Sequence, residues 1–500
     1  MPFLPFSLVH SLRGELDGTD AKVFTWGCDG YEECTQQWSE TCDTYVGATV
    51  RVTSVNQAAT VVRFATRHEL PFAGRGGGYS TTGASITHGG ILLDLSKLRE
   101  VHVDPVSETV VVQAGALWED VDVAAAQHQL AVVGSTLNQI GAAGATLGGG
   151  YGWLTGQYGL AIDNLVRVKM ILADGSIVTT SEKEMPDLFW AVRGAGQCFG
   201  VAAEMCFQAH KLGSHVFAGT LVFTVDKLPW IVSFANHFEN ASDGKQGFWF
   251  GFKMQDSVAQ CSILAIVFYN GAEAEARRFF SPVLSLESVL DTTQMLPYDG
   301  LNGILNTVDL TTRRNSLPNI DITYPNVSAS FRKSLRGSNI TLPLDIHFVQ
   351  SVYDEFNSFL TDHPETCDSR IFFELLPNKQ IRKVPNTATA FASRGPYYNV
   401  STLLAWRDAN LDDEIRLRQK RLMDRIGGSA GISRQTQYHP STHGTGLYAN
   451  YAGRDVPVRE IFGNNLSRLR ELKTIYDPHN TFRRWHNLME HDSPIDGGLD

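Results

Sequence analysis

Two glycine-rich segments in the first third of the chain constrain its fold and function most strongly. They are Arg75–Ser80 (RGGGYS) and Leu147–Trp153 (LGGGYGW). Because glycine has no Cβ, such a segment can turn its amides inward and approach a ligand closely. Successive inward amides form a nest that suits a phosphate or pyrophosphate. Two such segments predict a site for a large phosphorylated cofactor, and the alternative is that each is a tight turn between strands.

Length and charge limit the kinds of protein that this chain can be. With 500 residues it is long for one hydrophobic core, so two or three domains are expected. A formal net charge of -11 argues against nucleic-acid partners and anionic membranes, which need a basic face. The sequence has no apolar run long enough to cross a bilayer, so we expect no membrane partner.

The N-terminal residues and the cysteines bear on the compartment. Met1–Phe6 is apolar but short, with no basic flank and no small-residue cleavage site, so the sequence as given favours a cytoplasmic protein. A chain from which a signal peptide had been removed would be secreted. The chain has seven cysteines. Cys28, Cys34 and Cys42 lie close together in the sequence, so two of them could form a disulfide bond. Their spacing matches no zinc site, and we expect no metal.

Local patterns predict an α+β protein. Residues 54–70 have helical periodicity after the N-cap residue Ser54, whereas 100–114 and 166–180 are typical of hairpins. Strands and helices do not alternate as they would in a doubly wound sheet.

The second half of the chain adds aromatic strands and two further helices. Residues 247–252 and 371–374 indicate strands. A helix is expected over 412–426 with Gly427 as its terminator, and another over 466–476.

Neither glycine segment has the spacing of a nicotinamide-binding or P-loop motif, and the motifs around them instead resemble those of a known family. The sequence is similar to FAD-linked oxidases of the vanillyl-alcohol oxidase superfamily, berberine-bridge-enzyme-like branch. The matching strings are RGGGYS at 75–80, QAGALW at 113–118, residues 141–153, YGL at 158–160, DLFWAVRGAG at 187–196, YANY at 448–451 and DPHNTF at 477–482.

This resemblance implies a fold and a division into domains. The fold is α+β, with an FAD-binding domain of the vanillyl-alcohol-oxidase (PCMH) type in two α/β subdomains. A substrate domain with an antiparallel sheet covered by helices is inserted into it. The expected parts are an N-terminal FAD-binding part at 1–215, the substrate domain at 216–440 and a C-terminal return at 441–500. The implied partners are FAD and a small-molecule substrate, in a monomer or homodimer.

The resemblance also assigns residues to the flavin site. The expected cofactor-binding residues are Arg75, Gly76, Gly77, Gly78, Tyr79, Ser80, Gly83, Leu137, Ile140, Gly141, Gly144, Ala145, Thr146, Gly149, Gly152, Tyr158, Gly159, Asp163, Asn164, Gly196, Gly200, Val201 and Asn450.

Four of these positions depart from the pattern that the family implies. Tyr79 stands where a histidine bonds the flavin, and Leu137 stands where doubly linked members carry a cysteine, so we expect noncovalent FAD. Ala145 replaces a histidine near the flavin N1, where a donor would stabilise the reduced anion. Ile140 matches a position at which larger side chains accompany slow reaction with oxygen. Together these changes predict a weaker oxidant; the alternative is an ordinary oxidase in which Tyr79 packs on the flavin ring.

Two residues are candidates for acid-base work. Tyr448 begins the YANY motif and needs a nearby cation or strong donor to act at neutral pH; otherwise it is a pocket wall. Glu374 ends an apolar strand, where burial would raise its pKa; otherwise it is a surface or ion-paired residue.

We therefore expect hydride transfer from a small specialised metabolite, of aromatic, polyketide or alkaloid type, to flavin N5. The alternative is a redox-neutral isomerase or cyclase on the same scaffold, which would turn over substrate without bleaching the flavin. A third reading is a noncatalytic ligand-binding relative.

Overall fold

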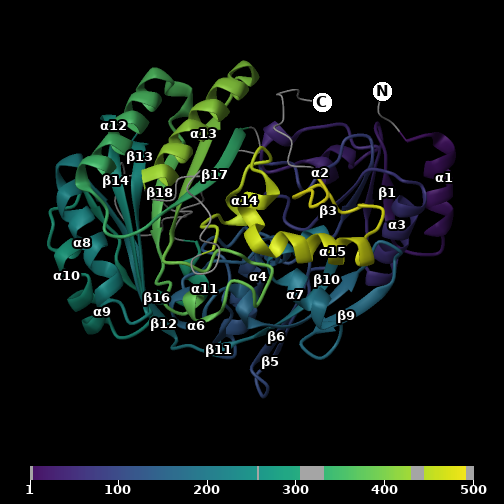
Figure 1. Ribbon diagram of the computed structural model, residues 1–500, viewed down its shortest axis with the longest axis horizontal. Coiled ribbons are helices and arrows are strands. Elements are labelled where there is room, and N and C mark those ends of the chain that lie inside the picture. The colour runs from purple at the N-terminus through teal and green to yellow at the C-terminus, as the bar shows by residue number, and fades with distance from the viewer. Residues whose placement is uncertain (1–3, 256–257, 304–330, 430–443, 491–500) are drawn as a thin grey trace.

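The computed structural model describes residues 4–255, 258–303, 331–429 and 444–490. Its two halves are visible in Figure 1, where one half holds a large sheet with helices outside it and the other holds two smaller sheets. The combination of sheets and packed helices confirms the predicted α+β class. None of the helices in this described part is both long and apolar enough to cross a membrane.

The first small sheet carries the first glycine segment at the end of a strand. Its strand order is β1-β2-β4-β3, with β2, β4 and β3 parallel and β1 antiparallel. The strands are β1 (Lys22–Phe24), β2 (Ala48–Arg51), β3 (Phe72–Arg75) and β4 (Ile91–Asp94). Helix α3 (Val55–Arg67) begins after Ser54, whose Oγ accepts a hydrogen bond from Gln57 N at 3.3 Å, so the predicted cap is confirmed. Helix α1 (Phe6–Glu15) contacts α3.

The second small sheet is antiparallel and contains both predicted hairpins. Its order is β5-β6-β10-β8-β9. The strands are β5 (Val101–Asp104), β6 (Thr109–Gln113), β8 (Leu165–Ile171), β9 (Ile177–Ser181) and β10 (Val201–Gln208). A two-stranded pair, β7 (Leu130–Ala131) with β11 (His210–Lys211), lies beside it. The helices of this half are α2 (Tyr31–Thr35), α4 (Trp118–Ala126), α5 (Ala142–Leu147), α6 (Thr155–Tyr158) and α7 (Pro186–Ala195).

The large sheet has eight strands, and its two faces serve different purposes. Its order is β15-β12-β14-β13-β18-β19-β17, with β16 also paired to β12. The strands are β12 (His215–Phe223), β13 (Gln246–Gln255), β14 (Val258–Tyr269), β15 (Leu290–Asp291), β16 (Gln294–Pro297), β17 (Arg332–Ile340), β18 (Arg370–Leu375) and β19 (Tyr398–Trp406).

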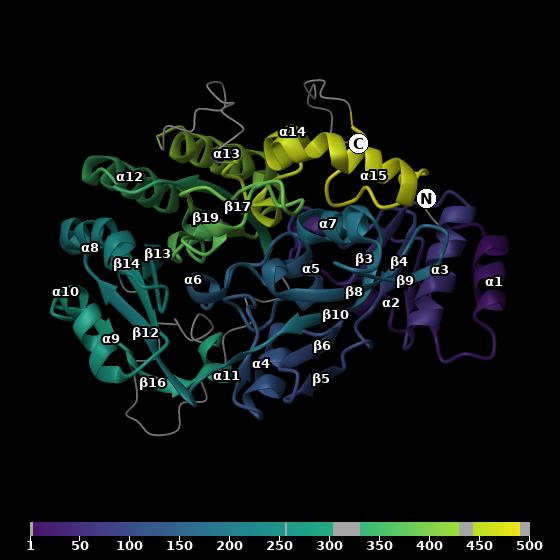
Figure 2. The ribbon, with the colours of Figure 1, turned by 60° about the horizontal axis from the view of Figure 1, so that its bottom comes forward.

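Alternation along the aromatic strand β13 explains its composition. Phe248, Phe250 and Phe252 belong to the core shared with the outer helices, whereas Trp249 belongs to the core shared with the N-terminal half. Figure 2 shows the helices outside the sheet. They include α8 (Leu228–Ala241), α9 (Glu273–Phe279), α10 (Ser281–Leu284), α12 (Ile346–Asp362) and α13 (Asp412–Ser429), while α11 (Tyr298–Leu301) contacts α4. The large sheet is therefore buried on both faces.

Helix α13 corrects one sequence expectation. Gly427 does not end the helix, which continues to Ser429. A Cβ at Gly427 would lie 2.7 Å from Ser338 Oγ on β17, so glycine lets the helix pack close to the sheet with Ser338 in this orientation. The predicted domain boundary between residues 440 and 441 lies outside the described residues.

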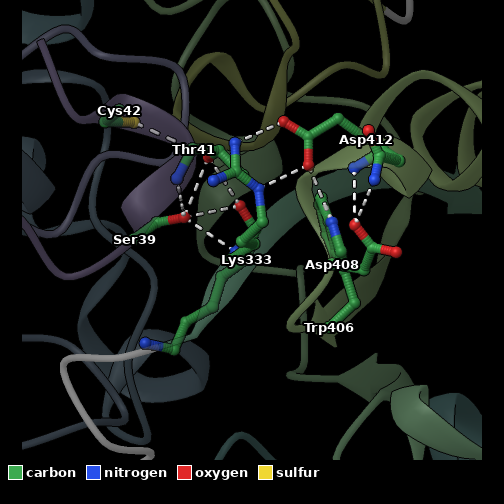
Figure 3. Close-up of polar contacts among 9 residues, drawn as sticks. Ser39, Thr41, Cys42, Lys333, Trp406, Asp408 and Asp412 are labelled. Atoms are coloured by element: carbon green, nitrogen blue, oxygen red, sulfur yellow. Dashed lines mark hydrogen bonds and ion pairs between the residues drawn. The ribbon is translucent and has the colours of Figure 1, made fainter.

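A polar cluster ties the N-terminal segment to strand β17 (Figure 3). Ser39 Oγ accepts a hydrogen bond from Lys333 N at 2.7 Å and donates to Lys333 O at 2.9 Å. Thr41 Oγ1 also donates to Lys333 O, at 3.1 Å. On the same strand, Arg332 forms an ion pair with Asp412 at the start of α13. These bonds connect three segments that are distant in the sequence.

The C-terminal helices return to the N-terminal half, as Figures 1 and 2 show. They are α14 (Val458–Phe462) and α15 (Leu466–Tyr476), and α15 coincides with the predicted helix and contacts α7. A fully buried lysine fixes this return. Lys473 Nζ donates to Asp477 Oδ2 at 2.7 Å, to Cys198 O at 2.6 Å and to Phe482 O at 2.8 Å.

Replacing Lys473 by methionine is expected to destabilise the protein strongly. The change leaves the buried Asp477 carboxylate without its cation, which costs about 3–5 kcal/mol. Thermal unfolding of Lys473→Met should show a large drop in midpoint, whereas Lys97→Met, at an exposed lysine, should unfold like the parent. Equal midpoints for the two variants would show that the buried pair does not hold the C-terminal return.

Candidate active site

A cavity of about 330 Å³ lies between the glycine segments and one face of the large sheet. This volume falls in the range of small-molecule sites. Many of the predicted cofactor residues line it, as do both acid-base candidates, Tyr448 and Glu374. The lining set from the prediction is Gly76, Gly77, Gly78, Tyr79, Ser80, Leu137, Ile140, Gly141, Gly144, Ala145, Gly200, Val201 and Asn450.

The other predicted cofactor residues do not line the cavity. They are Arg75, Gly83, Thr146, Gly149, Gly152, Tyr158, Gly159, Asp163, Asn164 and Gly196. Several of them support the wall from behind. Asp163 forms a buried ion pair with Arg394, with oxygen–nitrogen distances of 2.7 and 3.0 Å, and Asn164 hydrogen-bonds His210 at 2.7 Å.

The first glycine segment makes close backbone contacts with Gly141, which precedes helix α5, and with Ala114. A Cβ at Gly77 would lie 2.7 Å from Gly141 N, and one at Gly141 would lie 2.6 Å from Gly77 N. A Cβ at Gly76 would lie 2.7 Å from Ala114 O. Side chains at these positions would therefore push the cavity walls apart. At Gly144 a Cβ would meet nothing within 4 Å, because this residue faces the open cavity.

The wall formed by the first glycine segment fits an anionic cofactor group. Gly78 adopts a φ of 72°, which L side chains rarely adopt. The Arg75 guanidinium lies directly behind this turn: Nη1 donates to Cys34 O, and Nε is buried without a hydrogen-bond partner. A cation behind a turn of glycine amides suits a diphosphate such as that of FAD.

The residues that depart from the family pattern surround the same space. Tyr79 OH donates to Gln139 Oε1 at 2.9 Å, and its ring lies 5.2 Å from that of Trp38. Burial raises the pKa of Tyr79 to about 12, so this phenol is neutral near pH 7. Leu137 and Ala145 contribute only apolar side chains to the wall. Cys28, Cys34 and Cys42 form no disulfide.

Glu374 projects from β18 into the cavity and is buried, with 3% of its surface exposed. Ser401 Oγ donates to Glu374 Oε1 at 2.5 Å, and Tyr451 OH donates to the same oxygen at 3.2 Å. Burial raises the pKa of Glu374 to about 7, although the two hydrogen bonds lower it. No Lys or Arg within the described ranges forms an ion pair with this carboxyl group, so it can exist in either protonation state at neutral pH.

Tyr448 lines the same cavity, and its ring lies 4.8 Å from that of Tyr451. Its OH accepts hydrogen bonds from Asn450 Nδ2 at 2.9 Å and from Gly150 N at 3.3 Å. Asn450 Nδ2 also donates to Ala145 O at 2.9 Å, which connects the YANY motif to helix α5. Burial raises the pKa of Tyr448 to about 12, despite these donors. Its phenol is therefore neutral, with both lone pairs occupied and its proton available.

Sequence reasoning missed several cavity residues. Trp38, Arg370, Phe372, Ser401 and Tyr451 line the cavity, and none was assigned a role. The period-2 pattern of a strand would have placed Arg370, Phe372 and Glu374 on one face. For Trp38, no local signal exists, because its position depends on a residue distant in the sequence: the Nζ atom of Lys333 lies 4.9 Å from the centre of the Trp38 ring.

Two protein-family models match segments of the chain that contribute residues to the cavity. An FAD binding domain model matches residues 46–181, and a berberine and berberine like model matches residues 447–488. The first range contains both glycine segments, and the second contains Tyr448 and Asn450. The chain is thus an FAD-linked oxidoreductase, and residues from both matched ranges line the cavity.

Curated relatives and solved structures agree with this class. The FAD-linked oxidoreductases pgmH of Aspergillus terreus and hasG of Aspergillus fumigatus are 29% and 28% identical, and the matches cover 96% and 92% of this chain and 96% and 95% of theirs. The fold is that of Physcomitrella patens BBE-like 1 (TM-score 0.78, 20% identity, 96% and 99% coverage). It is also that of 6-hydroxy-D-nicotine oxidase from Arthrobacter nicotinovorans, with a TM-score of 0.77 and 23% sequence identity. This match covers 93% of this chain and 97% of the oxidase.

The chain therefore carries an FAD binding domain and a berberine and berberine like segment, and it is similar over nearly its whole length to FAD-linked oxidoreductases.

Glu374 is expected to make the protein less stable as the pH rises. Its pKa is about 7 in the folded state and ordinarily 4.5, so between these values the folded state holds a proton that the unfolded state releases. Stability must then fall from pH 4.5 to pH 7, by about 3 kcal/mol from this group. Thermal unfolding of Glu374→Gln at pH 5 and pH 8 should show the variant gaining stability relative to the parent at pH 8. Parallel pH dependences would contradict the raised pKa.

Proposed function

We propose that this protein holds FAD without a covalent bond and oxidises a small specialised metabolite, with Glu374 accepting the substrate proton. Bound FAD would supply the hydride acceptor, its N5 atom. The observation that carries the proposal is a buried carboxyl group in the flavin cavity, poised near neutral pH. We propose the domain division 1–215, 216–440 and 441–500 with it.

Glu374 is suited to remove a proton from a substrate hydroxyl or amine. A base works best when its pKa lies near the working pH, and burial brings Glu374 there. Ser401 and Tyr451 aim O–H groups at the carboxylate and fix its orientation. Burial is the main cause that raises the pKa of Tyr451 well above 10, and the nearby Glu374 raises it further. Tyr451 therefore keeps its proton and remains a hydrogen-bond donor.

Tyr448 is better suited to orient the substrate than to act as base. A phenol with a pKa of about 12 is rarely ionised at neutral pH. Because its oxygen already accepts from Asn450 and Gly150, its proton points to a further acceptor, such as a substrate oxygen. The two candidates thus divide the work: Glu374 takes the proton, and Tyr448 donates a hydrogen bond.

Three features of the cavity support noncovalent FAD. Tyr79 is a neutral phenol already bonded to Gln139, and Leu137 has no nucleophilic atom. The backbones of Gly76–Gly78 line the cavity and provide a binding surface for the diphosphate in place of a covalent bond, and the Arg75 guanidinium lies behind this surface.

The acid-base assignment predicts the kinetics of two variants. The FAD-loaded protein is first mixed anaerobically with a series of aromatic alcohols and amines. A compound that bleaches the flavin absorbance is taken as a substrate. With that compound, Glu374→Gln should slow bleaching by about 10²–10⁴-fold, because the general base is lost. Tyr448→Phe should slow it far less, and Glu184→Gln, at an exposed glutamate, should not change it.

The contrary outcomes are distinct. Unchanged bleaching in Glu374→Gln would remove this residue as base, and a larger loss in Tyr448→Phe would transfer the role to Tyr448. Turnover of a compound without any bleaching would favour the redox-neutral isomerase or cyclase.

The noncovalent assignment predicts where the flavin goes on denaturation. After acid precipitation, the yellow colour should pass completely into the supernatant, both for the parent and for Tyr79→Phe. Tyr79→His restores the histidine that the family pattern has at this position. In this variant, part of the yellow colour should stay with the pellet, because the histidine can bond to the flavin. Parent colour retained in the pellet would show a covalent bond.

A further inference from the structure

The cavity face of the large sheet is a regular array of side chains from four neighbouring strands. One row across β13, β18, β19 and β17 holds Trp249, Glu374, Asn399 and Asn339. Two residues along each strand, the next row holds Gly251, Phe372, Ser401 and Gly337, and the third holds Lys253, Arg370, Leu403 and Leu335. Directly paired residues of antiparallel strands share a face. The proposed base and a cationic row therefore lie on the same wall, on either side of Phe372.

Arg370 is the cation of this third row that lines the cavity. Its side chain is half-buried and makes no hydrogen bond or ion pair with any residue in the described ranges. Most of the other arginines that line or support this region have partners: Arg394 binds Asp163, and Arg484 Nε donates to Ile86 O. A guanidinium carries five donors and is costly to leave unmatched in a partly buried site.

The neighbours of Arg370 increase its demand for an anion. Lys253 lies directly opposite on β13, and its ammonium group offers Arg370 no acceptor. On the other side, Leu403 and Leu335 are apolar and offer no acceptor. Glu374, the acidic residue on the same strand face, is four residues away, which separates the two Cα atoms by roughly 13 Å. Its carboxyl group is engaged with Ser401 and Tyr451.

We propose that Arg370 binds a carboxylate group of the substrate, so that the enzyme acts on a small aromatic or polyketide-type carboxylic acid. This inference rests on the proposed function, because it names the substrate class of the same site. The planar guanidinium fork matches a carboxylate through two parallel hydrogen bonds. Phe372, between Arg370 and Glu374, supplies an apolar contact for the body of the molecule. The oxidised carbon then lies toward Glu374, and the carboxylate lies toward the far end of the cavity.

The test compares acids with their uncharged amides on the FAD-loaded protein. The probes are benzoate with benzamide and 2-naphthoate with 2-naphthamide, at pH 7.5, and binding is read as a perturbation of the oxidised flavin spectrum. We expect the parent to bind at least one acid about tenfold or more tightly than its amide. Arg370→Gln should lose this preference by weakening only the acid, and Arg370→Lys should keep part of it. Arg167→Gln, at an exposed arginine of β8, should behave like the parent.

Several outcomes would overturn the proposal. They are equal binding of acid and amide by the parent, binding of neither pair, and an unchanged acid preference in Arg370→Gln. If Arg370→Gln fails to retain FAD, Arg370→Met provides a second removal variant, and the same criterion applies to it. Failure of the proposed function has a different signature, since a protein that oxidises nothing would still show the acid preference.

Discussion

The contact between the backbones of Gly77 and Gly141 is the constraint on which the cavity depends. These residues come from different loops, yet each approaches the other so closely that a methyl group on either would strike backbone nitrogen at 2.7 or 2.6 Å. The contact aligns the first glycine segment with helix α5, and both then line one cavity. A similar restriction at Gly148, where a Cβ would lie 2.2 Å from Asn450 Oδ1, fixes the C-terminal return against the same helix. Ordering a glycine on folding costs more conformational entropy than ordering any other residue, and here that cost is offset by the close approach.

Local features of this fold could be predicted because their causes lie within a few residues. The Ser54 cap, the two hairpins and the helix at 466–476 all depend on neighbouring positions, and the structure has each of them. Gly427 shows where local reasoning fails. Glycine is a common helix terminator, but here its lack of a side chain serves packing against Ser338, which lies far away in the sequence.

The cavity itself depends on contacts that sequence patterns do not contain. Tyr451 reaches Glu374 across 77 positions, and Arg394 reaches Asp163 across 231. Whether a glutamate at the end of an apolar strand is exposed or buried is decided by what covers that face, and in β18 the cover comes from Tyr451. The motifs pointed to the residues of the site, but their division into cavity wall and supporting shell required the pairing of distant strands.

The spacing along β18 keeps two opposite charges from neutralising each other. If Arg370 and Glu374 were adjacent on one face, they would form an ion pair, the carboxyl pKa would fall, and neither group would be available to a ligand. Four residues of strand and the side chain of Phe372 separate them. Burial can then raise the pKa of Glu374 to about 7, while Arg370 has no ion-pair partner among the residues that the structure describes. The sheet therefore maintains a proton acceptor and an anion-binding group on one wall, at a separation that a ligand with an apolar body can bridge.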